Sequence, residues 1–221
     1  MFRTLVLGLL LLPFISFSQT STVELLVRPV PKPATVDAET LKWCQSQAGY
    51  DNLSGPAKEV FYWTNLCRNK PEEFWDSIMI PLLNAFPNLK TPESKSLKKD
   101  LLNTGQLPMF TLSSVLTRTA QLHTNDIAGK RAQPSHTSTN GVDFGARMKQ
   151  AGIKRCAGEN MSLGNQDVLL SVALLYLDIN LPDLGHRKTL LSKDYQEMGV
   201  GFSKYGRDQF FMVEDFSCLQ Q

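Results

Sequence analysis

The end of the chain constrains the fold most, because it contains two strand-like runs joined by a short turn. Residues 197–203 and 209–216 are rich in apolar and aromatic side chains, and Gly206 lies between them. Glycine readily adopts the positive φ that tight turns require, so the pattern predicts an antiparallel hairpin. Helical patterns precede it. We therefore expect an α+β or α/β/α layering, with a small, mainly antiparallel central sheet flanked by helices.

Helical periodicity covers much of the chain before the hairpin. The longest amphipathic pattern, at residues 112–127, keeps one side apolar and predicts a central helix. A helix is expected at 57–68, and Pro81 should kink or divide another at 71–86. Two further helices are predicted at 143–151 and 165–178.

The N-terminal eighteen residues have the pattern of a secretory signal peptide. Arg3 precedes an apolar run that ends in small residues. This run is shorter than the ~20 residues that span a bilayer, and no later segment approaches that length. We expect a cleaved signal peptide at 1–18, an N-terminal leader at 19–55 and one domain at 56–218. The protein should be secreted or periplasmic.

The charge balance narrows the choice of partners. The chain has 23 basic and 21 acidic residues, so no excess charge favours nucleic acid or an anionic membrane. We expect a monomer that has no transmembrane segment and binds no nucleic acid.

Four cysteines follow the predicted signal peptide: Cys44, Cys67, Cys156 and Cys218. Export makes disulfides chemically permissible, and four cysteines allow three pairings. We expect Cys44 to pair with Cys67 and Cys156 with Cys218, because each bridge would attach a terminal segment to the body. Buried, reduced thiols are the alternative.

Common enzyme signatures are absent from the sequence. It contains no P-loop, G-x-G-x-x-G, H-E-x-x-H or G-x-S-x-G motif. Histidine is scarce, and each of the three lies in a segment rich in glycine, acidic or turn residues: His123, His136 and His186.

Eight short motifs follow one another between residues 57 and 217. They are residues 65–71, residues 120–128, Ser135-His136, Gly141 with Arg147 and Gly152, Gly158-Glu159-Asn160, Gly185-His186-Arg187, Gly199-Val200-Gly201 and Asp215-Phe216. In this order and spacing they resemble the bacterial branch of the CAP superfamily, the cysteine-rich secretory, antigen 5 and pathogenesis-related proteins with an SCP-like domain. The resemblance implies an open central cavity lined by two histidines and two acidic residues, where some members bind a divalent metal.

By this resemblance, His136, Glu159 and His186 are cavity residues and should converge in space. The second acidic position falls on Asp178, where many members have glutamate, so this chain departs from the pattern there. The first three are also candidate metal ligands, since two imidazoles and a carboxylate suit zinc or another divalent metal. They could instead act as acid and base.

Structural roles remain open for these residues. His136 could be a turn histidine bonded to nearby backbone, and Glu159 could cap a helix or pair with Arg147 or Arg187. If so, the motif residues would hold loops together.

Three further motif residues are expected to be structural. His123 lies on the apolar stripe of the helix predicted at 112–127, which favours a buried, hydrogen-bonded imidazole. Asn160 can tie a loop to backbone groups, and Arg187 can clamp a carboxylate such as Asp183 or Asp215.

The function therefore stays open among three classes. The first is a secreted protein whose cavity binds a lipid, peptide or glycan, with or without a metal. The second is a metal-dependent, peptidase-like hydrolase, and the third is a structural or interaction module of the cell envelope. Whether the chain is an enzyme is not decided by its sequence.

Overall fold

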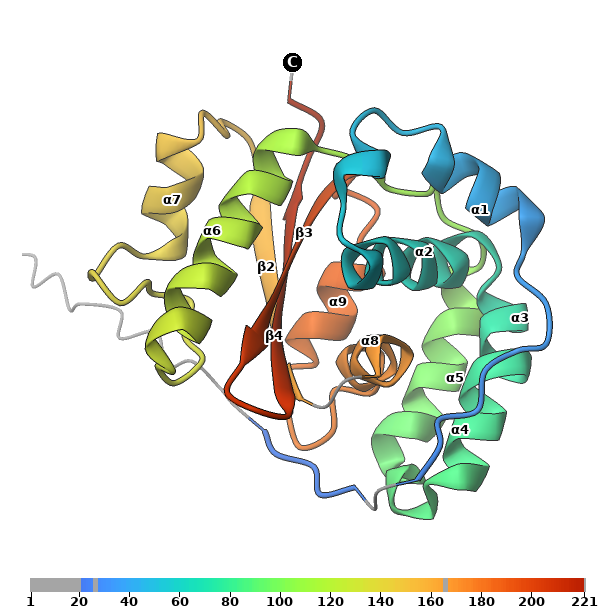
Figure 1. Ribbon diagram of the computed structural model, residues 1–221. Coiled ribbons are helices and arrows are strands. Elements are labelled where there is room, and N and C mark those ends of the chain that lie inside the picture. Colours follow the sequence, from blue (N-terminus) through green and yellow to red (C-terminus); the bar gives the residue numbers. More distant parts are fainter. Residues whose placement is uncertain (1–20, 26–27, 165–166, 221) are drawn as a thin grey trace, which may run out of the picture.

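The computed structural model describes residues 21–25, 28–164 and 167–220. The predicted signal peptide lies outside these residues. Within them, helices cover both faces of a four-stranded sheet with the order β1-β3-β4-β2 (Figure 1). The strands are β1 (Thr111–Leu112), β2 (Ala157–Gly164), β3 (Glu197–Tyr205) and β4 (Gln209–Ser217). The α+β fold with its mainly antiparallel sheet is confirmed.

The predicted hairpin is the centre of the sheet. β3 and β4 pair antiparallel from Glu197 opposite Ser217 to Tyr205 opposite Gln209, and Gly206 has φ 67° in the turn between them. β2 pairs antiparallel with the other side of β4, and the short β1 runs parallel to β3. β2 therefore forms one outer edge of the sheet.

The α-helices make up a little under half of the described chain. In order they are α1 (Ala38–Gln45), α2 (Gly55–Asn69), α3 (Pro71–Phe74), α4 (Ile80–Ala85), α5 (Pro92–Thr104), α6 (Ser114–Lys130), α7 (Phe144–Gln150), α8 (Val168–Leu177) and α9 (Gly185–Leu190). The helix predicted at 71–86 is divided: a π turn at Trp75–Met79 separates α3 from α4 just before Pro81. Proline lacks the N–H that a continuous α-helix needs at this point.

Side-chain caps explain where five of the helices begin. The residue before each helix accepts a hydrogen bond from the backbone N–H three positions later, which satisfies a donor that the helix leaves free. These caps are Asp37, Ser54, Ser113, Asp143 and Asp167.

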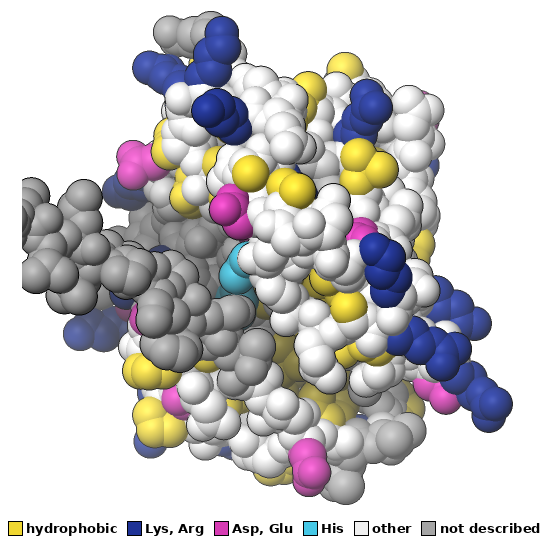
Figure 2. Space-filling model, turned by 90° about the vertical axis from the view of Figure 1, so that its left-hand side faces the viewer, with side chains coloured by type: hydrophobic (Ala, Val, Ile, Leu, Met, Phe, Trp, Pro, Cys, Tyr) yellow, Lys and Arg dark blue, Asp and Glu magenta, His cyan; other side chains and the backbone are white. Residues whose placement is uncertain are grey.

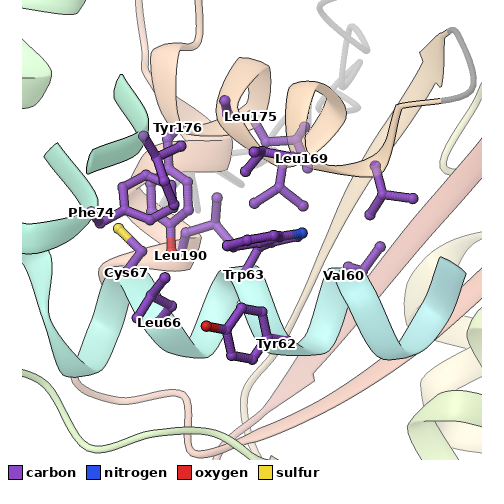
Figure 3. Close-up of a cluster of buried hydrophobic side chains, with 14 of the residues drawn as sticks. Val60, Tyr62, Trp63, Leu66, Cys67, Phe74, Leu169, Leu175, Tyr176 and Leu190 are labelled. Carbon is purple, nitrogen blue, oxygen red and sulfur yellow. The ribbon is translucent and has the colours of Figure 1, made fainter. Parts of the chain in front are cut away.

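The two faces of the sheet are covered differently. α6 lies across β3 and β4 on one face, where Gly199 and Gly201 let its backbone approach β3 closely. On the other face, α2, α8 and α9 enclose the larger hydrophobic core (Figure 1). Figure 3 shows this core, with Trp63 of α2 between the side chains of α8 and the rest of α2.

Only one of the two expected disulfides is present. Cys156 and Cys218 are bridged with their Cα atoms 5.5 Å apart, as predicted, whereas Cys44 and Cys67 are free and buried. Cys44 contacts Asn65 of α2. Cys67 lies two residues further along α2 and directs its thiol toward α3 and α8 (Figure 3). Helix residues two apart do not share a face, so the predicted Cys44–Cys67 bridge was wrong.

The segment before α2 is attached to the rest of the protein. Arg28 donates to the carbonyl of Ala85 at 2.7 Å, and Asp37 forms an ion pair with Lys70. Cys44 and Tyr50 belong to the larger core. No helix in the described ranges is long and apolar enough to cross a membrane.

Candidate functional site

A cavity of about 620 Å³ lies at the outer edge of β2. Glu159 and Asn160 of β2 both line it. Successive side chains of a strand point to opposite faces of the sheet, so the cavity extends around the edge of β2. Figure 2 looks onto the side that carries α6 and α7 and shows a histidine side chain at the surface near an acidic one.

The wall on the α7 side is built around Glu159. The Nδ1 atom of His136 lies 2.8 Å from its Oε1, and Arg147 of α7 forms an ion pair with its Oε2. Glu159 is 1% exposed, whereas His136 is 42% exposed. Burial by itself raises the pKa of Glu159, but the hydrogen bond with His136 and the charge of Arg147 outweigh it and lower the pKa below its ordinary value.

The loop that carries His136 is fixed from behind by His123. This imidazole is buried on α6, with Nε2 2.8 Å from the carbonyl of Ser135 and Nδ1 3.2 Å from the hydroxyl of Ser138. Burial lowers the pKa of His123, which favours the neutral ring. Arg147 also donates to the carbonyl of His136 at 2.8 Å. The loop therefore presents His136 from a supported backbone.

The wall on the α9 side repeats the pairing of an imidazole with a carboxylate. Asp178 ends α8 with φ 55°, and its Oδ1 lies 2.7 Å from Nδ1 of His186. Its Oδ2 accepts the backbone N–H of Arg187 at 3.1 Å. Asp178 is buried behind His186 and does not line the cavity, unlike the position that the resemblance implied.

Arg187 holds the base of this wall. Its buried guanidinium donates to the carbonyls of Tyr176 and Leu177 and forms an ion pair with Asp100 of α5. The carboxylate partners suggested from the sequence, Asp183 and Asp215, are not the ones that it binds in the described chain.

Asn160 connects the floor of the cavity to a second buried acid. Its Nδ2 lies 3.4 Å from the carbonyl of His186 and 3.3 Å from Oε2 of Glu214, whose Oε1 accepts from Thr64 at 3.3 Å. Burial raises the pKa of Glu214 to about 7. Glu214 was not predicted as a site residue, although a charged residue within a run of apolar strand residues was an available signal.

Asp215 is the counterpart of Glu214 on the α6 face. It stands opposite Glu159 in the pairing of β2 with β4. Burial and the neighbouring charge of Glu159 raise its pKa well above the ordinary value. The hydroxyl of Thr119 lies 2.6 Å from Asp215 Oδ2 and 2.8 Å from the carbonyl of Leu116. One hydroxyl proton cannot serve both acceptors, which fits a protonated Asp215 beside an ionised Glu159.

His136, Glu159 and His186 thus line one cavity. In both histidines Nδ1 is engaged by a carboxylate, so the neutral ring holds its proton there and presents Nε2 as an acceptor. Neither Nε2 atom has a hydrogen-bond partner among the described residues. Within the same ranges, no group of three or more His, Cys, Asp or Glu side chains is arranged to hold a metal.

These features define a class of protein: an α/β/α sandwich with a cleft at the sheet edge lined by histidines and a carboxylate. A family model described as the cysteine-rich secretory protein family, CAP, matches residues 103–216, just over half of the chain. The chain therefore belongs to the CAP family, which confirms the resemblance seen in the motif order.

Several solved structures are similar to the chain. An extracellular protein with an SCP domain from Bacillus anthracis is 21% identical with a TM-score of 0.47, and the alignment covers 75% of this chain but only 41% of that one. An outer surface protein from Borrelia burgdorferi is 19% identical, with a TM-score of 0.43 and coverage of 58% and 87%. Venom allergen-like protein 4 of Schistosoma mansoni is 12% identical, with a TM-score of 0.43 and coverage of 76% and 92%. No curated protein matches the chain.

Proposed function

We propose that this CAP protein is secreted and that the cavity at the edge of β2 binds a polar ligand. One observation carries the proposal: two imidazoles, each oriented by a buried carboxylate, line the same cavity. Supporting groups that fix a side chain in this way are typical of binding sites. A purely structural role would not require a free Nε2 acceptor on both rings.

The chemistry of the lining favours a ligand with hydrogen-bond donors. The two Nε2 acceptors are accompanied by hydroxyl, amide and carboxylate groups, and apolar side chains are few: Phe144 and Leu181. A peptide or a glycan carries the hydroxyl, amide or ammonium donors that such acceptors require.

Asparagine variants test this role because asparagine keeps a donor near the position of Nδ1 and removes Nε2. In His136→Asn and His186→Asn, binding of a hit from peptide and glycan arrays should weaken by about tenfold or more, the usual scale for one lost polar contact in a buried site. The melting temperature should stay near that of the wild type. Lys154→Ala, outside the cavity, serves as the binding control.

The outcome separates binding from a structural role. If neither array yields a ligand and the asparagine variants melt well below the wild type, the histidines hold the fold together and the binding proposal fails. A hit that binds both variants as tightly as the wild type would place its site elsewhere.

A second candidate is a divalent metal between His136 and His186. A carboxylate on the far ring nitrogen is the usual support of a metal-binding histidine, and both rings have one. Glu159 does not fit as the third ligand, because His136 and Arg147 occupy its two oxygens. Two imidazoles would hold the ion, which would supply Lewis-acid chemistry when bound. Zinc titration of the wild type and of the double variant His136→Asn/His186→Asn, followed by calorimetry at pH 7.5, tests this candidate.

A further inference from the structure

The outer edge of β2 leaves backbone groups unpaired. The N–H of Cys218 donates to the carbonyl of Cys156 at 3.0 Å, and the pairing continues in register to the end of β2. In an antiparallel pair, alternate residues direct both N–H and C=O toward the partner, and the residues between them direct theirs away. Glu159, Met161 and Leu163 therefore direct their backbone groups away from β4.

No protein group takes up these positions in the described part of the chain. The backbone groups of Glu159, Met161 and Leu163 make no hydrogen bond there, whereas the outward carbonyl of Ala157 accepts from the hydroxyl of Tyr195 at 3.1 Å. An unpaired edge is a template for another strand. Because Glu159 also lines the cavity, a ligand in the cavity meets this edge.

The charge of the cavity indicates what such a strand would carry. Asp143 and Asp183 are exposed on opposite walls, and no lysine or arginine of the described ranges lines the cavity. The charge of Glu159 is already offset by Arg147. The remaining negative charge is complementary to a basic side chain.

We propose that the edge of β2 binds an extended peptide, which joins the sheet as an added strand and places a basic side chain between Asp143 and Asp183. Main-chain hydrogen bonds to Glu159, Met161 and Leu163 hold the peptide, and alternate side chains enter the cavity. Pairing along this stretch needs roughly five residues. The inference rests on the proposed function, since it names the ligand class of the same cavity.

Backbone pairing is tested with a library of blocked heptapeptides that carry lysine or arginine at a fixed central position. The tightest peptide is remade with N-methyl groups on alternate amides, which removes the main-chain donors and keeps every side chain. Its affinity in fluorescence polarisation should fall by about tenfold or more. Amide exchange measured by NMR should show Met161 and Leu163 becoming protected when the parent peptide binds.

The matching change in the protein is Met161→Pro, which removes one outward N–H without breaking a bond to β4. Met161→Ala is its control, because it truncates the side chain and keeps the N–H. Binding should weaken in the proline variant alone, and Leu163→Pro with Leu163→Ala repeats the comparison if Met161→Pro does not fold.

Three results are distinguishable. Equal affinity of the parent and N-methylated peptides would overturn the strand-pairing inference and leave the cavity as a peptide site. A glycan hit lost in the asparagine variants, with no peptide hit, would also overturn it while the proposed function stands. No ligand of either kind would refute both.

Discussion

Replacement of Gly199 by alanine should displace α6 from the sheet. A Cβ atom at this position would lie 2.1 Å from the backbone carbon of Leu116 and from the backbone nitrogen of Thr117. Ordinary contact begins at 3.4 Å, so the two backbones must separate by about 1.3 Å. Neither atom is the end of a flexible side chain, and the strain cannot be relieved by a change of rotamer.

The expected cost follows from this geometry. Overpacking of side chains typically costs ~1–3 kcal/mol, and a clash between backbones should reach or exceed the upper end. Domains of this kind have a total stability of ~5–15 kcal/mol, so Gly199→Ala should remove a large part of it. Urea unfolding followed by circular dichroism should show the midpoint lowered by about 1 M or more.

Gly129→Ala is the control, because Gly129 lies in α6, the helix that Gly199→Ala should displace. Nothing lies within 4 Å of a Cβ atom there, and alanine has the higher helix propensity, so its stability should be unchanged or raised by up to about 1 kcal/mol. A Gly199→Ala midpoint within error of the wild type would show that α6 does not approach β3 as closely as described. Because α6 also carries His123, which fixes the loop of His136, the loss of packing should disturb the support of Glu159.

Three further predictions concern buried charges and the disulfide. Burial raises the pKa of Glu214 to about 7, so between pH 4.5 and 7 the folded state keeps a proton that the unfolded state has released. Stability should therefore fall by roughly 3 kcal/mol as the pH rises from 4.5 to about 7 and level off above that, and Glu214→Gln should remove this slope in urea unfolding at pH 5 and pH 8. Arg147→Met should cost about 3–5 kcal/mol, because it leaves the buried carboxylate of Glu159 without its arginine partner and bonded only to His136; adding Glu159→Gln should recover part of that loss in thermal unfolding. Removing the bridge between Cys156 and Cys218, 62 residues apart, should cost about 4 kcal/mol, and mass mapping of the native protein should find this bridge together with two thiols that react only after unfolding.

Periodicity predicted the elements whose burial pattern is regular. The helix expected at 57–68 lies within α2, the helix expected at 112–127 overlaps α6 except for its first two residues, and the hairpin was located to within two residues. β2 has no β-branched residue, contains three polar side chains and begins and ends near glycine, so propensity alone does not identify it. It becomes a strand through its pairing with β4, which is a tertiary effect.

The candidate site was predictable only as far as the motifs extended. They identified His136, Glu159 and His186, which line one cavity. Motif order does not show which way a side chain points, and Asp178 lies behind His186 and does not line the cavity. Glu159 also forms the ion pair with Arg147 that the structural alternative had foreseen. The predicted bridge between Cys44 and Cys67 failed for the same reason, since an even count does not reveal which side of a helix a thiol occupies.

The bridge between Cys156 and Cys218 closes β2, α8, α9, β3 and β4 into a covalent ring. A protease that cuts once in the exposed turn between α8 and α9 opens one wall of the cavity, yet both pieces remain joined and can reassemble. A single cut in the loop that carries His136 falls outside the ring, and only non-covalent packing then holds the two fragments together. The two walls of the cavity therefore differ in how they would survive proteolysis: after a cut in the His186 wall the pieces stay covalently joined, whereas a cut in the His136 wall can separate the chain.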